Sequence, residues 1–163
     1  MADTGNTIGN NAKTGLVEAL NGALADTLAL YVKTKNFHWH VAGPRFRDLH
    51  LLFDEQAAQM LATVDDIGER VRKNAADTLT SIGSIARTTR IPDEDSTTVD
   101  PDTMVDQLLE GNKLLHRRLK EVKEKSEEAG DNATSGIVDD WIDQTEERIW
   151  FLSQNLKEGD ARV

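Results

Sequence analysis

The sequence has no cysteine, so it can form no disulfide bond and offers no thiolate to a metal ion. A metal site in this chain must therefore be built from histidine and carboxylate side chains. The chain also lacks an apolar run long enough to cross a bilayer, and its first residues, MADTGNTIGNNAK, lack the apolar segment of a secretory signal. These absences predict a cytoplasmic protein with no membrane segment.

Basic and aromatic residues are scarce. Lys and Arg number 19 against 29 Asp and Glu, which gives a formal net charge of −10, and aromatic residues make up 5% of the chain. The acidic balance opposes non-specific binding to nucleic acid and favours the collection of cations. A core with so few aromatics must be mostly aliphatic, and 163 residues suit a single domain.

Apolar residues recur with helical spacing in four long segments, and none of the three prolines interrupts one of them. The short apolar patch SIGSIA predicts a small extra helix in the long connection between the second and third segments. We therefore expect an all-α four-helix bundle over residues 14–157, with a flexible tail over 1–13 and a short tail over 158–163. The first three long helices are expected from about Thr14 to the VAGP stretch, from about Arg45 to Asn74, and from Pro101 to about Ala129. The fourth is expected to start after a cap at Asp131 or Asn132 and to end before the polar stretch KEGDARV.

Two of these helices have a clear buried face. The first carries a row of residues spaced seven apart, which we expect to point towards the bundle or an interface: Val17, Leu24, Tyr31 and His38. The predicted buried face of the second helix consists of Leu49, Leu52, Phe53, Gln56, Met60, Val64, Ile67 and Val71.

Two pairs of potential metal ligands lie on the second helix, His50 with Asp54 and Asp65 with Glu69. An α-helix turns by about 100° per residue. Measured around the helix axis from His50, Asp54, Asp65 and Glu69 therefore lie near 40°, 60° and 100°, on a stripe beside the buried face. His50 and Asp65 are nevertheless about 22 Å apart along the axis, whereas metal–ligand bonds are about 2 Å long. One helix cannot close such a site.

The numbering suggests how two chains could close it. The numbers of His50 and Glu69 add up to 119, as do those of Asp54 and Asp65. If two copies of the helix pack antiparallel about a two-fold axis between residues 59 and 60, each pair meets a pair of the partner and two identical sites form. The residues between the pairs are small or apolar and would allow close approach: Ala57, Ala58 and Leu61.

His38 can join this site from the first helix. Two imidazoles and two or three carboxylates suit Fe(II), Mn(II) or Zn(II). Taken alone, each pair is more typical of a solvated helix face, and the equal sums together with the small residues between the pairs are what favour a site. The remaining histidines, His40 and His116, have no partner pattern and are interpreted as surface or interface residues.

The stretch HWHVAGPRFRDLHLLFDEQAAQMLATVDDIGER closely resembles the Dps family, the mini-ferritins also described as DNA-binding proteins from starved cells. The family pattern is H-W, then G-x-x-F-x-x-x-H-x-x-x-D, then D-x-x-x-E-R, and the likeness extends from about residue 14 to 157. The matching residues are His38, Trp39, Gly43, Phe46, His50, Asp54, Asp65, Glu69 and Arg70.

The resemblance implies a ferritin-like four-helix bundle and a hollow dodecamer with ferroxidase sites at its two-fold interfaces. His38, His50 and Asp54 of one subunit would meet Asp65 and Glu69 of its mate. It further implies oxidation of Fe(II) by hydrogen peroxide in preference to oxygen, storage of ferric mineral inside the shell, and protection against oxidative damage.

The resemblance also assigns roles outside the metal site. Trp39, and Trp150 with it, could intercept stray oxidising equivalents, although packing in a core is the main role expected of both. Iron would enter through acidic pores near the start of the last helix. The segment after Arg70, VRKNAADT, departs from the family because it lacks the usual Gly-Gly turn. The pore candidates are Asp131, Asp139, Asp140 and Asp143.

DNA compaction is the alternative function within the same family, and it commonly depends on a mobile tail rich in Lys and Arg. Residues 1–13 contain only Lys13, opposed by Asp3, and the C-terminal tail mixes both signs of charge. Phosphate neutralisation needs several cations together. We therefore expect weak or no direct DNA binding. The protein would be associated with the nucleoid only if it did bind DNA.

Overall fold

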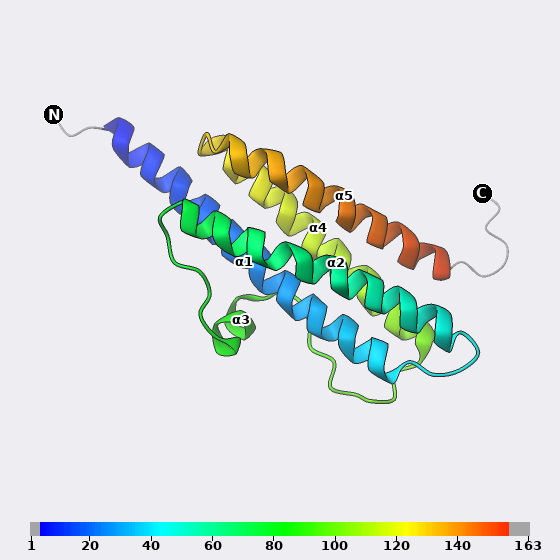
Figure 1. Cartoon of the computed structure of the whole chain (residues 1–163). Helices are drawn as coiled ribbons and strands as arrows, with labels where there is room; N and C mark the ends of the chain where they lie inside the picture. Colours follow the sequence, from blue (N-terminus) through cyan, green and yellow to red (C-terminus); the bar gives the residue numbers. More distant parts are fainter. Residues whose placement is uncertain (1–3, 157–163) are drawn as a thin grey trace.

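The computed structural model of the chain describes residues 4–156, with side chains described from residue 9 onward. Within that range there are five helices and no strand. The four long helices lie side by side as a bundle, and the short helix lies against α1, in the connection between α2 and α4 (Figure 1). The predicted all-α fold is thus confirmed. The helices are α1 Thr4–His40, α2 Phe46–Lys73, α3 Ile82–Thr88, α4 Pro101–Glu128 and α5 Asn132–Asn155.

Local capping chemistry sets the ends of α4 and α5. The Asp100 side chain accepts a hydrogen bond from the backbone N–H of Thr103, and Pro101 occupies the first helical position, where its missing N–H costs nothing. Gly130, with a φ of +67°, turns the chain between the two helices. Asp131 then caps α5 by accepting from the backbone N–H of Thr134.

The start of α1 differs from the prediction. The helix begins at Thr4 rather than near Thr14, so the prediction of a flexible tail is wrong for residues 4–13. Residues 9–11 and 13 are exposed, which is why no apolar period marks this segment. Extending an existing helix requires no new nucleation, so a polar segment can continue it at little cost. Residues 1–3 and the predicted C-terminal tail lie outside the described range.

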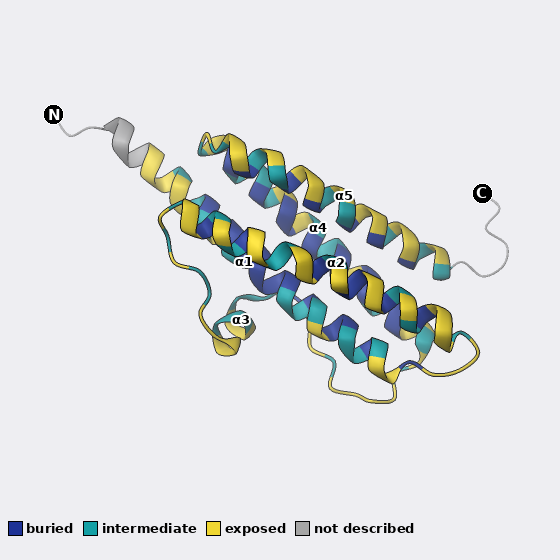
Figure 2. Ribbon diagram, viewed as in Figure 1, coloured by how far each residue is buried: buried dark blue, intermediate teal, exposed yellow. Residues whose placement is uncertain are grey.

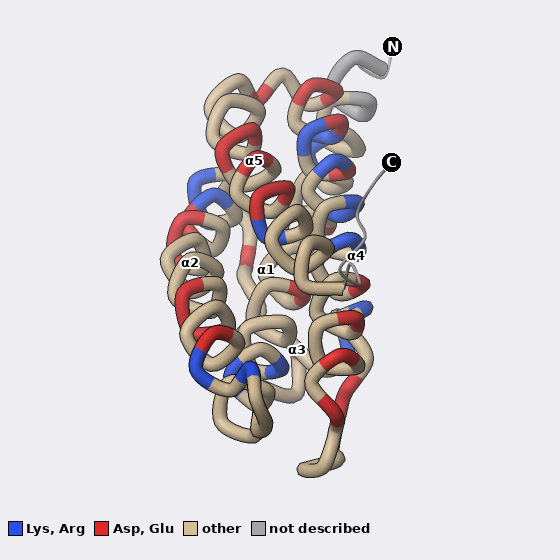
Figure 3. The backbone as a smooth tube through the Cα atoms, turned by 90° about the vertical axis from the view of Figure 1, so that its right-hand side faces the viewer, with Lys and Arg blue, Asp and Glu red and all other residues tan. Residues whose placement is uncertain are grey.

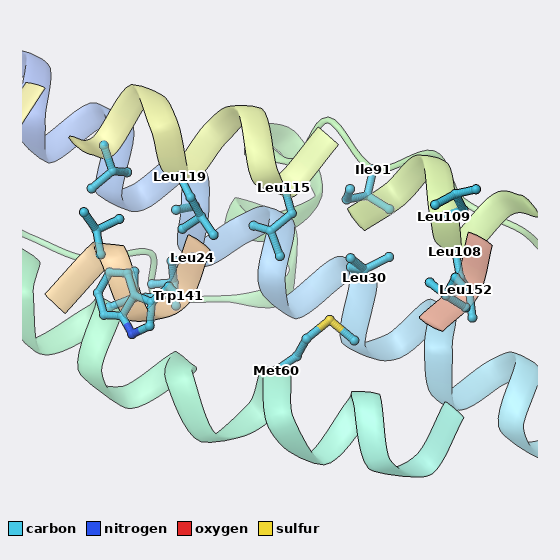
Figure 4. Packing of buried hydrophobic residues seen from close by; sticks show 14 of the residues in the cluster. Leu24, Leu30, Met60, Ile91, Leu108, Leu109, Leu115, Leu119, Trp141 and Leu152 are labelled. Atoms are coloured by element: carbon cyan, nitrogen blue, oxygen red, sulfur yellow. The ribbon is translucent and has the colours of Figure 1, made fainter. Parts of the chain in front are cut away.

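The core is aliphatic, as the composition predicted, and fills the space between the long helices (Figure 2; Figure 4). Leu30 of α1, Met60 of α2, Leu115 of α4 and Leu152 of α5 are among its fully buried side chains. On α2 the predicted face is buried except for Leu52 and Val64, which are half-buried and pack against the core.

A buried carboxylate ties the long connection to the bundle. Asp26 of α1 is 0% exposed and accepts hydrogen bonds from the Thr89 hydroxyl at 2.9 Å and the Arg90 backbone N–H at 2.6 Å. Its second oxygen accepts from Nε of Arg118, on α4, at 3.1 Å. Since a buried charge is tolerated only when it is paired and hydrogen-bonded, this cluster holds α1, α4 and the connection together.

Candidate metal half-site

Two stacked histidines form the corner where α1 ends and α2 begins. The rings of His38 and His50 lie 3.8 Å apart, centroid to centroid, with an interplanar angle of 18°. Nδ1 of each ring is 2.7 Å from the backbone carbonyl oxygen of the other residue. A carbonyl can only accept, so both Nδ1 atoms donate a proton, and in the neutral rings both Nε2 atoms keep a free lone pair. This is the tautomer that a metal ligand needs.

Asp54 lies one helical turn beyond His50 and faces the same corner. Its Oδ1 is 3.8 Å from Nε2 of His38 and 2.7 Å from Nζ of Lys35. The hydrogen bond from Lys35 holds the pKa of the Asp54 carboxyl below its ordinary value, so this group is an anion at neutral pH. The structure therefore brings together three of the five predicted ligands.

Sequence reasoning missed Lys35. It lies one turn before His38 on α1 and is its neighbour on that face, and its Nζ also lies 5.7 Å from the centre of the Trp39 ring. The i, i+3 spacing from His38 was the available signal, but only the tertiary contact shows that this lysine pairs with Asp54.

The other two predicted ligands, Asp65 and Glu69, lie towards the far end of α2, and both are exposed. Among the described residues, Glu69 pairs only with Lys73, one turn along the same helix, at 3.0 Å. Across residues 4–156 of one chain, no group of three or more His, Asp and Glu side chains is arranged to hold a metal ion. The five predicted ligands thus form two separated sets in one chain.

The surface between these sets is partly apolar. The bounds of α2, residues 46 and 73, have their midpoint between 59 and 60, which is the position of the two-fold axis in the antiparallel pairing predicted above. Leu61 is 48% exposed and Ala58 is exposed beside it, whereas Ala57 is 1% exposed. The prediction that Ala57 belongs to an interface stripe is therefore wrong, because that methyl group packs inside its own bundle.

The two tryptophans of interest are also placed differently from the expectation. Trp39 and Trp150 are 65% and 59% exposed, so neither packs in the core of its own chain, while Trp141 does. Trp39 follows His38 at the α1 corner, and Trp150 makes an edge-to-face contact with Phe151, with ring centroids 5.1 Å apart. Both indoles are accessible on the surface of the single chain.

Among the predicted pore residues, Asp131 has a different role. Both of its carboxylate oxygens lie 2.9 Å from Nη2 of Arg70, and it also accepts from Asn74 and Thr134. Burial opposes ionisation of this group, but the hydrogen bonds from Asn74, Thr134 and Arg70 outweigh it and hold the pKa of Asp131 well below its ordinary value. Asp131 is thus an anchor between α2 and α5 rather than a free carboxylate.

The other three pore candidates lie on the outside of α5. Asp139 pairs with Lys123 of α4 at 2.9 Å, and Asp140 and Asp143 are exposed. Figure 3 shows acidic residues spread along α2 and α5. Asp140 and Asp143 form no ion pair with a described residue, whereas Asp139 is engaged by Lys123.

The fold and the histidine–carboxylate corner define a ferritin-like protein, and comparison with known proteins agrees. The family model of the ferritin-like domain matches residues 17–161. The chain is 29% identical, over 85% of its length and 96% of the relative's, to a DNA protection during starvation protein of Helicobacter pylori.

Two solved structures have the same fold. The Dps protein of Vibrio cholerae superposes with a TM-score of 0.85 and 26% identity, over 90% of this chain and 92% of that one. An archaeal Dps homologue from Halobacterium salinarum superposes with a TM-score of 0.87 and 25% identity, over 94% of this chain and 85% of that one. The chain belongs to the Dps family of ferritin-like proteins.

Proposed function

We propose that this protein is a ferroxidase and iron-storage mini-ferritin that oxidises Fe(II) with hydrogen peroxide at sites shared by two subunits. The observation that carries the proposal is the His38–His50 pair. Its reciprocal carbonyl bonds leave both Nε2 atoms free beside the Asp54 carboxylate. The Dps protein of Vibrio cholerae is described as a member of a broad superfamily of ferritin-like diiron-carboxylate proteins, which supports iron as the substrate here.

The missing ligands would come from the partner subunit. An antiparallel pair of α2 helices about the midpoint of the helix would set the exposed Asp65 and Glu69 of one chain against His50 and Asp54 of the other. Anionic ligands favour the higher oxidation state of iron because they stabilise the added positive charge.

Peroxide is the oxidant that fits paired iron ions. Two Fe(II) ions give one electron each to hydrogen peroxide, which takes up two protons and leaves as two water molecules. Because both electrons are transferred to the same peroxide molecule, no hydroxyl radical is released. The ferric product would be stored as mineral within a dodecameric shell, and the exposed carboxylates of α5 would lead iron towards its interior.

The shared site is tested by complementation between two variants. Fe(II) oxidation by peroxide and by oxygen is followed by stopped flow for the wild type, His50→Ala and Glu69→Ala, with Asp66→Ala as the control for removing an exposed carboxylate of α2. We expect each site variant to lose fast oxidation and the control to keep it.

Mixing the two inactive variants through dissociation and reassembly should restore activity. In a heterodimer one site carries both substitutions and the other is intact, so random pairing at equal amounts restores about a quarter of the wild-type sites. Mixed dimers that are proven to form but stay inactive would rule out sharing.

DNA protection is the second candidate function, and the names of several relatives favour it. The formal net charge of −10 argues against direct binding to phosphates. We expect plasmid mobility on a gel to be unchanged by the protein at moderate ionic strength, and a complex that persists there would reverse this assignment.

A further inference from the structure

A polar cleft lies between α2 and α5, and one buried side-chain oxygen in its lining lacks a hydrogen-bond donor among the described residues. The two helices run side by side (Figure 1), and polar side chains meet across the middle of their contact. Nε2 of Gln59 lies 3.3 Å from Oε2 of Glu147, and Nη1 of Arg148 lies 2.6 Å from Oε1 of Gln59. These side chains, with Glu55 and Gln56, line a cleft of about 170 Å³.

Gln56 supplies the feature that needs an explanation. Its side chain is 5% exposed and lines the cleft, yet its Oε1 accepts no hydrogen bond from any described residue. Its Nε2 donates to the backbone carbonyl of Arg148 at 3.4 Å, so turning the amide over would lose that bond. A buried acceptor is costly when it is unsatisfied, and it can be satisfied by a donor group or by a cation.

Two carboxylates lie at the same cleft. Gln59 donates to Oε2 of Glu147, and Oε1 of that carboxylate accepts no hydrogen bond from a described residue. Glu55, next to Gln56 on α2, is exposed and forms no ion pair with any described residue. One amide oxygen and two carboxylates make an all-oxygen donor set, which Mg²⁺, Ca²⁺ and Mn²⁺ prefer.

Arg148 is the positive group of this cleft, and only one of its three side-chain hydrogen bonds, the bond to Gln59, is made within the cleft. It is 4% exposed, and its Nε and Nη2 donate to Asn112 and Thr145 inside the bundle. Burial lowers the pKa of Arg148 to about 10, and the negative charge of Glu147 opposes this shift. Its bond to Gln59 also turns the Gln59 amide so that the N–H group faces Glu147. Two carboxylates against one guanidinium leave the cleft net negative.

We propose that this cleft binds one divalent cation per chain, held by the Gln56 side-chain oxygen and by the carboxylates of Glu55 and Glu147. The site lies between two helices of one chain, so it does not depend on the shared site at the α1–α2 corner. A water molecule in the cleft is the competing occupant, since water could also donate to Gln56.

Calorimetric titration with Mn²⁺ tests the proposal on the assembled protein. The titration uses a background of Asp54→Asn with Glu69→Gln, which removes two carboxylates from the proposed shared site. We expect one Mn²⁺ per chain in this background and a loss of affinity of at least about tenfold on adding Glu147→Gln, because one of two charged ligands is gone. The matched control is Glu146→Gln, the same change of charge one residue away, where the carboxylate pairs with His116 of α4. No bound Mn²⁺ in the background, or equal affinity in the two variants, would overturn the proposal.

Replacing Gln56 by leucine separates a cation from a water molecule. Gln56→Leu removes the unsatisfied oxygen, so the metal-free variant should melt at a higher temperature than the metal-free background protein. Added Mn²⁺ should then raise the melting temperature of the background protein and leave that of the variant unchanged, since only a bound cation stabilises by mass action. An equal rise in both proteins would mean that the cleft holds water only.

Discussion

Two glycines within long helices should respond in opposite ways to the same substitution. A Cβ atom added at Gly22 on α1 would meet three atoms of the Arg118 guanidinium at 2.6–2.8 Å. A Cβ added at Gly136 on α5 would have no heavy atom within 4 Å. Both substitutions by alanine gain helix propensity, about 1 kcal/mol each.

The cost at Gly22 comes from the buried pair that Arg118 forms. The guanidinium cannot move away from a new methyl group without weakening its bond to Asp26, a carboxylate that is 0% exposed. Breaking a buried pair costs about 3–5 kcal/mol, and Asp26 keeps its bonds to Thr89 and Arg90, so the lower part of that range applies. Set against the gain in propensity, Gly22→Ala should destabilise the protein by about 2 kcal/mol, whereas Gly136→Ala should stabilise it by up to about 1 kcal/mol.

Urea unfolding, followed by helical circular dichroism at a fixed protein concentration, measures both changes. A fixed concentration is necessary because assembly stabilises the folded chain by mass action. Unfolding of Gly22→Ala at the same urea concentration as the wild type, or higher, would show that the Asp26–Arg118 pair does not depend on the absence of a side chain at position 22.

Three further predictions concern the two ends of α2. Asp131→Ala should cost about 2–3 kcal/mol, from a lost helix cap and lost hydrogen bonds to Arg70. Because the folded-state pKa of Asp131 is lowered, this contribution is present above its ordinary value of 3.8 and disappears as the pH falls below it, so unfolding curves of variant and wild type should converge in acid. Ala75 has a φ of +55°, so Ala75→Gly should raise the free energy of unfolding by about 0.5–1 kcal/mol, and a decrease would contradict strain there. Lys35→Met removes the ammonium group that competes with a metal ion for the Asp54 carboxylate, so it should increase the metal affinity measured by calorimetric titration. An unchanged affinity would mean that Lys35 does not compete.

The elements that sequence reasoning placed well depend on interactions within a few residues. The third and fourth long helices begin close to where they were expected, because the carboxylates of Asp100 and Asp131 each accept a hydrogen bond from a backbone N–H three residues ahead. The spacing of His50 and Asp54 placed both on one side of α2 for the same local reason. The start of α1 was predicted wrongly because this segment is polar and its residues 9–11 and 13 are exposed, so no apolar repeat in the sequence marks it as helical.

What the sequence by itself determined is the helical framework and the residue types that face one side of each helix, because these follow from a repeat of 3.6 residues and from local capping. Only the tertiary structure decided which side chains meet across helices. It paired Lys35 with Asp54, used Asp131 to anchor Arg70, left Trp39 exposed and turned Ala57 into the core. The two ion pairs join residues on different helices. The exposure of Trp39 and the burial of Ala57 concern positions at the edge of a buried helix face. There a rotation of one residue, about 100°, changes the partner of a side chain, and only the packing of the whole bundle fixes that rotation.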